Sequence, residues 1–177
     1  MSLPDPRHIL ALPLVLLLGL AACGFTPVYA PGGTGAALYG KIAIQSPEEI
    51  KTDNEVNAYL LVRNLEERVG RASGGDYRLD LSLRTRSEGQ AITAGNETTR
   101  YSIVGVASYS LIRLSDGVIV ASGSEDAFTG YSATGSTVET LAGERDANAR
   151  LMQILADQIT ARVLTTADLA AAAPTAE

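Results

Sequence analysis

The chain has 177 residues, enough for one domain, and its 14 Lys and Arg against 20 Asp and Glu give a net charge of −6. A chain with this acidic balance is not expected to bind nucleic acid in general. His8 is the only histidine and Cys23 the only cysteine, so an intramolecular disulfide is excluded.

The first 22 residues have the three zones of an export signal. A polar start that carries Arg7 precedes an apolar run over residues 9–20, and small residues then lead to Cys23. The apolar run is shorter than the roughly 20 residues that a membrane-spanning helix needs. The tetrad Leu20-Ala21-Ala22-Cys23 resembles the lipobox of bacterial lipoproteins. The alternative is an ordinary export signal that is cut near a cysteine by chance.

The lipobox resemblance predicts a signal peptide over residues 1–22 and a Cys23 that carries an S-diacylglyceryl group and an acylated amine. Several acyl chains hold a protein at a membrane far more firmly than one. Residue 24 is Gly rather than Asp, which by resemblance to enterobacterial lipoproteins favours the periplasmic side of the outer membrane. Without His8, and with Cys23 acylated, we expect no His or Cys catalysis, no metal site and no cofactor.

The first part of the mature chain is predicted to be a tether followed by a strand and a helix. Residues 23–40 are rich in Gly, Pro and Ala and predict a flexible tether that carries the lipid. A short strand is expected over residues 41–45. Residues 52–69 predict a helix, because apolar side chains recur at helical spacing after a capping box of Thr52 and Glu55.

Three strands are predicted in the middle of the chain. Residues 77–86 alternate between apolar and polar side chains, which gives one buried and one solvent-exposed face. Strands over residues 100–114 and 118–130 follow, joined at Asp116-Gly117, a strong hairpin signal. The strand over 100–114 is apolar on both sides. This indicates either that its outer face meets a partner or that it is a central strand beneath a long loop.

A second long helix is expected from about Val138 to Thr165, begun by a capping box of Ser136 and Glu139. Residues 167–177 predict a disordered tail. The order β-α-β-β-β-α predicts an α+β domain over residues 41–166, a two-layer sandwich in which a four-stranded sheet carries two helices on one face. No further element is predicted to cover the second face of that sheet.

Three segments of the chain carry a family resemblance. The first is Cys23-Gly24-Phe25-Thr26-Pro27-Val28-Tyr29, the most specific of the three, in which Val28 stands where leucine is expected. The second is the hairpin that runs from Val106 through Asp116-Gly117, and the third is Glu144-Arg145-Asp146-Ala147 with the residues over 155–159. Together with the order of elements, they resemble the LptE family of lipopolysaccharide-assembly lipoproteins, in its alphaproteobacterial form.

The resemblance implies a binding protein rather than an enzyme. Members of the family sit as a plug inside a large outer-membrane β-barrel of the LptD type, which places lipopolysaccharide (LPS) in the outer leaflet. The chain is thereby expected to bind such a barrel, to assist LPS assembly and to be held at the membrane by lipid. LPS carries phosphates, so Arg84, Arg86 and Arg100 are candidate contacts if their strands are antiparallel neighbours. The alternative is that these arginines face solvent or the barrel.

Two other functions are compatible with the sequence. One is that of a binding or scaffold lipoprotein of another envelope-assembly pathway. The other is that of a lipid-anchored hydrolase built on carboxylates, Glu125 with Asp126 or Glu144 with Asp146. Neighbouring residues on a strand point to opposite faces, and residues two apart on a helix do not face each other, so both pairs are poorly placed for catalysis.

Overall fold

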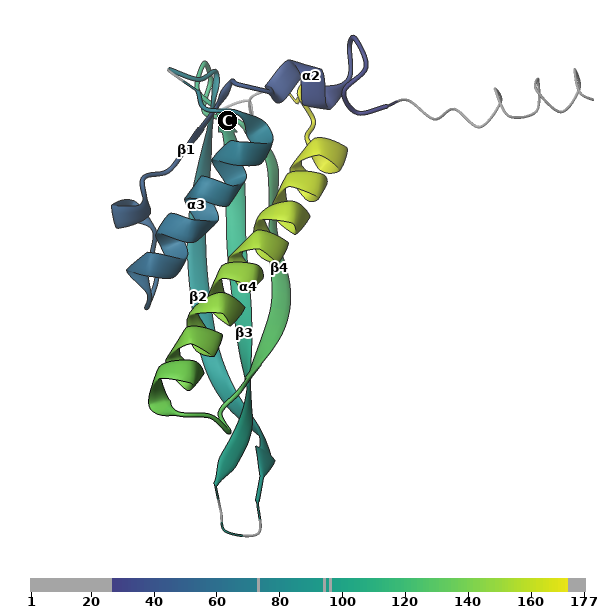
Figure 1. Cartoon of the computed structure of the whole chain (residues 1–177). Coiled ribbons are helices and arrows are strands. Elements are labelled where there is room, and N and C mark those ends of the chain that lie inside the picture. Colours follow the sequence, from purple (N-terminus) through teal and green to yellow (C-terminus); the bar gives the residue numbers. More distant parts are fainter. Residues whose placement is uncertain (1–26, 73, 94, 96, 172–177) are drawn as a thin grey trace, which may run out of the picture.

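The computed structural model describes residues 27–72, 74–93, 95 and 97–171. In chain order the elements are α2 (Thr34–Leu38), β1 (Ile42–Ile44), the 3-10 helix η1 (Pro47–Glu49), α3 (Glu55–Val69), β2 (Tyr77–Ile92), β3 (Thr98–Arg113), β4 (Ile119–Ser132) and α4 (Thr137–Thr166). The sheet has the order β1-β2-β3-β4, with β1 parallel to β2 and the other pairs antiparallel. Helices α3 and α4 lie on the same face of the sheet (Figure 1). The predicted α+β two-layer sandwich is therefore confirmed.

The core lies between the sheet and the two long helices. On β2 the side chains of Leu79, Leu81 and Leu83 point to the helices and are buried, as the alternation in the sequence predicts. Leu151 and Leu155 of α4 belong to the same buried cluster, and both pack over Gly105 of β3. Burial of one such side chain contributes about 1.5–3 kcal/mol, so this shared interface is what holds the helices on the sheet.

The helix N-termini agree only in part with the prediction. The capping box of Ser136 and Glu139 is confirmed, because the Ser136 N–H donates to Glu139 Oε2 at 2.7 Å and the Glu139 N–H donates to Ser136 Oγ. The predicted box of Thr52 and Glu55 is wrong. Asn54 caps α3 instead, and its side chain accepts the Asn57 N–H at 3.1 Å. An asparagine is as good an N-cap as threonine, and here it lies closer to the first buried residues.

Residues 34–38 are a correction to the predicted tether. They form α2, and Leu38 at its end is fully buried in the core. Gly33 precedes the helix, and a Cβ at this position would lie 2.3 Å from the Val28 carbonyl oxygen, so the turn closes tightly only because glycine is there. Burial of Leu38 and the hydrogen bond from the Gly40 N–H to the Val69 carbonyl at 2.7 Å therefore hold a segment whose composition is that of a linker. Cys23 and the predicted signal peptide lie outside the described residues.

The start of the predicted disordered tail is also ordered. The Asp168 N–H donates to the Val120 carbonyl at 2.9 Å, and Arg113 donates from its guanidinium to the carbonyls of Leu169 and Ala171. Leu169 is half-buried against the core. The chain after α4 is therefore fixed to the β3–β4 end of the sheet as far as residue 171, and residues 172–177 lie outside the described part.

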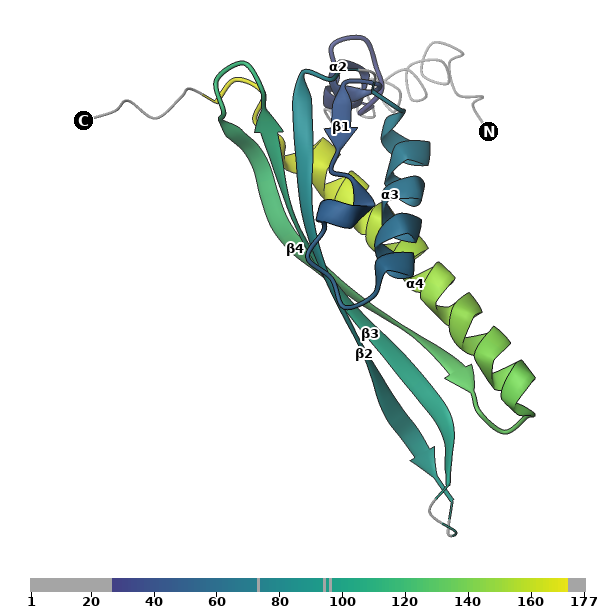
Figure 2. The same cartoon turned by 90° about the vertical axis from the view of Figure 1, so that its left-hand side faces the viewer.

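The β2–β3 hairpin is longer than predicted. β2 continues from the expected end at Arg86 to Ile92, and Thr98 to Arg113 of β3 pairs with it in antiparallel register. Both views show this hairpin extending past the N-terminal end of α4, so its outer part is not covered by a helix (Figure 2). Ser87, Glu88 and Gly89 have no apolar alternation, and pairing with β3 is what keeps them in a strand.

Candidate binding groove on the open sheet face

The face of the sheet opposite the helices is lined by two cross-strand rows. In one row Arg86 on β2 lies opposite Val104 on β3, which lies opposite Phe128 on β4. In the next row Arg84 lies opposite Val106. Directly opposite residues on neighbouring strands point to the same side, so cationic and apolar side chains stand side by side on this open face.

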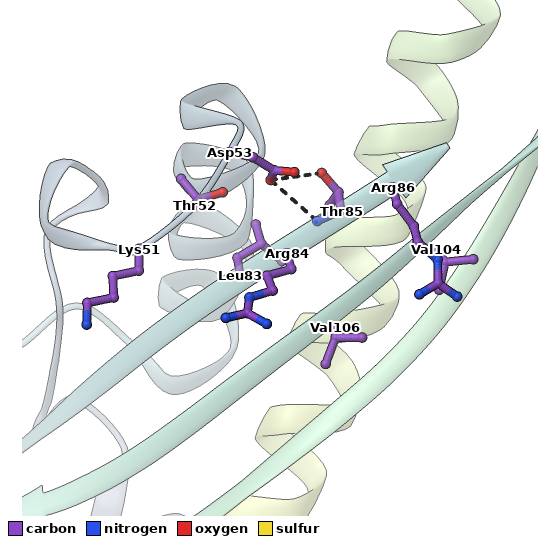
Figure 3. Close-up of a pocket in the computed structure, with 9 residues that line it drawn as sticks. All are labelled: Lys51, Thr52, Asp53, Leu83, Arg84, Thr85, Arg86, Val104 and Val106. Atoms are coloured by element: carbon purple, nitrogen blue, oxygen red, sulfur yellow. Dashed lines mark hydrogen bonds between the residues drawn. The ribbon is translucent and has the colours of Figure 1, made fainter. Parts of the chain in front are cut away.

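A groove of about 600 Å³ opens along this face where β2 meets the segment before α3. Figure 3 shows the cationic ends of Lys51, Arg84 and Arg86 along β2, with Val106 and Val104 beside them on β3. The lining of the groove also includes Thr52, Asp53, Leu83 and Thr85.

Hydrogen bonds to the edge of β2 fix residues 51–53, which form one wall of the groove. The Leu83 N–H donates to the Lys51 carbonyl at 3.0 Å, and Asp53 Oδ1 accepts from the Thr85 N–H and hydroxyl at 3.4 and 3.3 Å. The Asp53 carboxylate is thereby directed to the strand edge. Lys51 is fixed by its backbone, which leaves its side chain exposed.

The cations of the open face differ in whether a carboxylate neutralises them. Arg78 binds Asp80 with two hydrogen bonds, which raise the pKa of its guanidinium, and Arg86 Nε donates to Glu88 at 2.7 Å. Within the described part of the chain, neither Arg84 nor Lys51 forms an ion pair or a side-chain hydrogen bond. The groove thus holds two cations that form no ion pair, together with the Asp53 carboxylate, which accepts hydrogen bonds from Thr85.

The apolar part of the open face is exposed rather than covered by a loop. Val106 is 38% exposed and Phe128 is 73% exposed, although β3 is an inner strand of the sheet. The sequence left two interpretations of this strand, a partner on its outer face or a long loop over it. In the described residues, no loop covers Val106 or Phe128. An apolar surface beside free cations is suited to a ligand that is both apolar and anionic.

The structure brings together two of the three predicted arginines. Arg84 and Arg86, both on β2, line the groove, and β2 and the strand β3 of Arg100 are antiparallel neighbours as the prediction required. Arg100 faces the same side but lies four residues beyond Val104, about 13 Å farther along β3, and does not line the groove. Lys51 and Phe128 were missed. The Leu83–Lys51 hydrogen bond places Lys51 beside the arginines, and the register places Phe128 across Val104 from Arg86, outside the groove lining.

The acidic pairs considered for a hydrolase are not assembled. Glu125 points to the helical face, where Arg162 Nε lies 3.3 Å from it, whereas its neighbour Asp126 is opposite Val106 on the open face. Asp146 forms an ion pair with Arg150 on α4. Burial and the charge of Glu125 raise the pKa of Tyr109 on the helical face. The Glu125–Arg162 ion pair joins the sheet to α4, whereas the Asp146–Arg150 pair lies within the helix.

Comparison with known proteins identifies the family. The family model named LptE, lipopolysaccharide-assembly, matches residues 41–163, which is more than half of the chain. The chain belongs to this family. The resemblance inferred from sequence is thereby confirmed, and membership assigns this LptE-family protein to lipopolysaccharide assembly and its transport machinery at the level of the family. No curated protein sequence matches the chain.

Solved structures share the fold. A protein of Caulobacter crescentus CB15 described as a lipoprotein is 17% identical and has a TM-score of 0.55, over 75% of this chain and 93% of that one. An uncharacterized lipoprotein B of Nitrosomonas europaea is 10% identical and has a TM-score of 0.52, over 71% and 83% of the two chains. At these identities the likeness concerns the LptE fold alone. In the described residues, no helix has the length and apolar character to cross a bilayer.

Proposed function

We propose that this LptE-family protein is an outer-membrane lipoprotein, anchored through Cys23, that forms a plug complex with the β-barrel of the LPS translocon. In this role it assists LPS assembly at the cell surface by binding and without catalysis. Family membership over residues 41–163 is the observation that carries the proposal.

Two measurements test the anchor and the complex. Mass spectrometry of the native protein is expected to find an acylated Cys23 as the first residue. Purification from outer membranes in mild detergent is expected to recover a large β-barrel protein in a stable complex. The alternative, a scaffold of another envelope pathway, predicts other partners and normal surface LPS when the protein is depleted. An unmodified Cys23 thiol, or a preparation without the barrel, contradicts the proposal.

We further propose that the groove contacts LPS directly. Lys51 and Arg84 offer free cations for a phosphate. Val104 and Val106 of the groove, with Phe128 next to Val104 on β4, offer apolar surface for an acyl chain. Arg86 can contribute if it leaves Glu88, whereas Arg100 is too far along β3 to share the same phosphate. Solvated arginines that contact no lipid are the alternative.

Replacement of Arg84 tests this contact. Arg84→Ala is expected to weaken LPS binding by the purified protein roughly tenfold, because a charge-assisted hydrogen bond to phosphate is lost. Arg145→Ala is the matched control, since Arg145 is an exposed arginine of α4 without an ion-pair partner among the described residues. Binding should also weaken as salt screens the charges. Equal affinities of the two variants contradict the proposal.

A further inference from the structure

Two exposed tyrosines at the α2 end of the molecule are not explained by the groove. Tyr29 is 57% exposed and Tyr39 is 60% exposed, on either side of α2. They line one crevice, together with the buried Leu38 and Val69. The Tyr29 ring covers Gly35, where a Cβ would come within 2.8 Å of it. We call Tyr29 and Tyr39 the tyrosine pair.

The tyrosine pair lies next to the proposed lipid. Pro27, the first described residue, follows Cys23 by four positions, and four residues span at most about 14 Å when fully extended. The described chain reaches α2 within a few residues of that point. Figure 2 shows α2 at the end of the molecule opposite to the outer part of the β2–β3 hairpin. An acylated Cys23 therefore holds the α2 end, and not the hairpin, close to the bilayer.

The charges at this end do not favour an anionic surface. Lys41 lies 3.6 Å from Asp76, and Arg71 lies 2.8 Å from Glu66, so each exposed cation has a carboxylate beside it. Tyrosine has an apolar ring and a polar hydroxyl, and it is enriched where a protein meets the headgroup region of a membrane. The composition of the α2 end thus suits a zwitterionic phospholipid surface.

We propose that the tyrosine pair inserts into the headgroup region of the bilayer that holds Cys23, and so fixes the α2 end of the domain against the membrane. This inference rests on the lipid anchor of the proposed function. The pair gives the domain a defined orientation, because its two rings add a second contact with the bilayer and so restrict tilting about the lipid. The outer part of the β2–β3 hairpin is then directed away from that membrane surface.

Tryptophan reporters can test the orientation, because the chain has no tryptophan of its own. The lipidated mature protein is reconstituted into phosphatidylcholine vesicles that contain brominated lipid, a quencher of tryptophan fluorescence. The reporters are Tyr29→Trp, Tyr39→Trp and, on the open sheet face, Phe128→Trp. We expect severalfold more quenching at positions 29 and 39 than at 128, with no loss at high salt. Stronger quenching at 128 overturns the inference, because the domain would then lie on its open face.

A second set of variants distinguishes the effect of the tyrosine side chains on quenching from the effect of the nearby lipid anchor. Ala36→Trp places a reporter on the exposed side of α2. We expect its quenching to fall severalfold when Tyr29→Ser and Tyr39→Ser are added. The matched control adds Val56→Ser and Val138→Ser, which remove two apolar side chains that are 67% and 77% exposed elsewhere, and should leave the quenching unchanged. Unchanged quenching in the Tyr29→Ser, Tyr39→Ser variant overturns the inference.

Flotation distinguishes failure of the inference from failure of the proposed function. If the wild-type protein carries no lipid and does not float with the vesicles, the proposed anchor is contradicted, and the orientation with it. Protein that floats but shows unquenched reporters at positions 29 and 39 leaves the anchor intact and overturns the orientation alone.

Discussion

Gly105 of β3 lies directly beneath α4, under two of its leucines. A Cβ at this position would come within 3.0 Å of Leu151 Cδ2 and 3.1 Å of Leu155 Cδ1. Both leucines are fully buried, and a packed interior leaves little room for them to move aside. The absence of a side chain here therefore sets the distance between the sheet and α4.

Substitution of Gly105 is expected to destabilise the domain. Gly105→Val should lower the free energy of unfolding by about 1–3 kcal/mol, as overpacking does in other cores, and Gly105→Ala should lower it less. Ser108→Val, on the open face of the same strand, is the control and should change it by no more than about 0.5 kcal/mol. Urea denaturation measures the free energy of unfolding of each variant. A Gly105→Val protein as stable as the control would mean that α4 does not pack as described.

At the scale of elements, the sequence predicts which segments are helices and strands better than where they end. The spacing of apolar residues in the sequence indicates both long helices and the three long strands, because each element buries one face. It does not indicate that β2 continues beyond Arg86, since Ser87 to Gly89 are held by pairing with β3. It also misses α2, because the burial of Leu38 depends on a core built by residues far away in sequence.

The β3–β4 turn shows a contact of this long-range kind and makes a prediction about pH. Arg113 Nη2 donates to Asp116 Oδ2 at 2.7 Å, and the same guanidinium binds the carbonyls of Leu169 and Ala171. The hydrogen bond from Arg113 lowers the pKa of Asp116. A carboxyl whose pKa is lower in the folded state contributes stability above its unfolded pKa, and this contribution is lost as the pH falls through the folded value.

We therefore expect wild-type stability to decline below about pH 4 in part through Asp116. Asp116→Asn should lower stability at neutral pH and flatten the decline at acidic pH, as measured by denaturation across the pH range. Asp126→Asn is the control, because Asp126 is exposed and has no ion pair among the described residues. Identical pH profiles for wild type and Asp116→Asn would show that the turn does not carry this linkage.

Considered as a whole, the molecule carries both of the proposed binding surfaces on one domain. The α2 end lies a few residues from Cys23, and the groove with its free cations lies on the open face of the sheet. The sequence could predict that Arg84 and Arg86 share a face, because alternation fixes the side to which each points. It could not place Lys51 beside them or Phe128 across Val104 from Arg86, since that depends on the register between strands and on the path of the chain before α3.

The open face allows LPS binding and barrel binding to be separated in one variant. Phe128→Ser removes a side chain that is 73% exposed, so the free energy of unfolding should change by no more than about 0.5 kcal/mol. We expect it to weaken LPS binding severalfold, because an apolar contact beside the cations is lost, while the barrel still co-purifies. Val138→Ser, which removes a side chain that is 77% exposed at the start of α4, should change neither. If Phe128→Ser instead abolishes recovery of the barrel and leaves LPS affinity unchanged, the open face belongs to the barrel contact and the groove is not the LPS site.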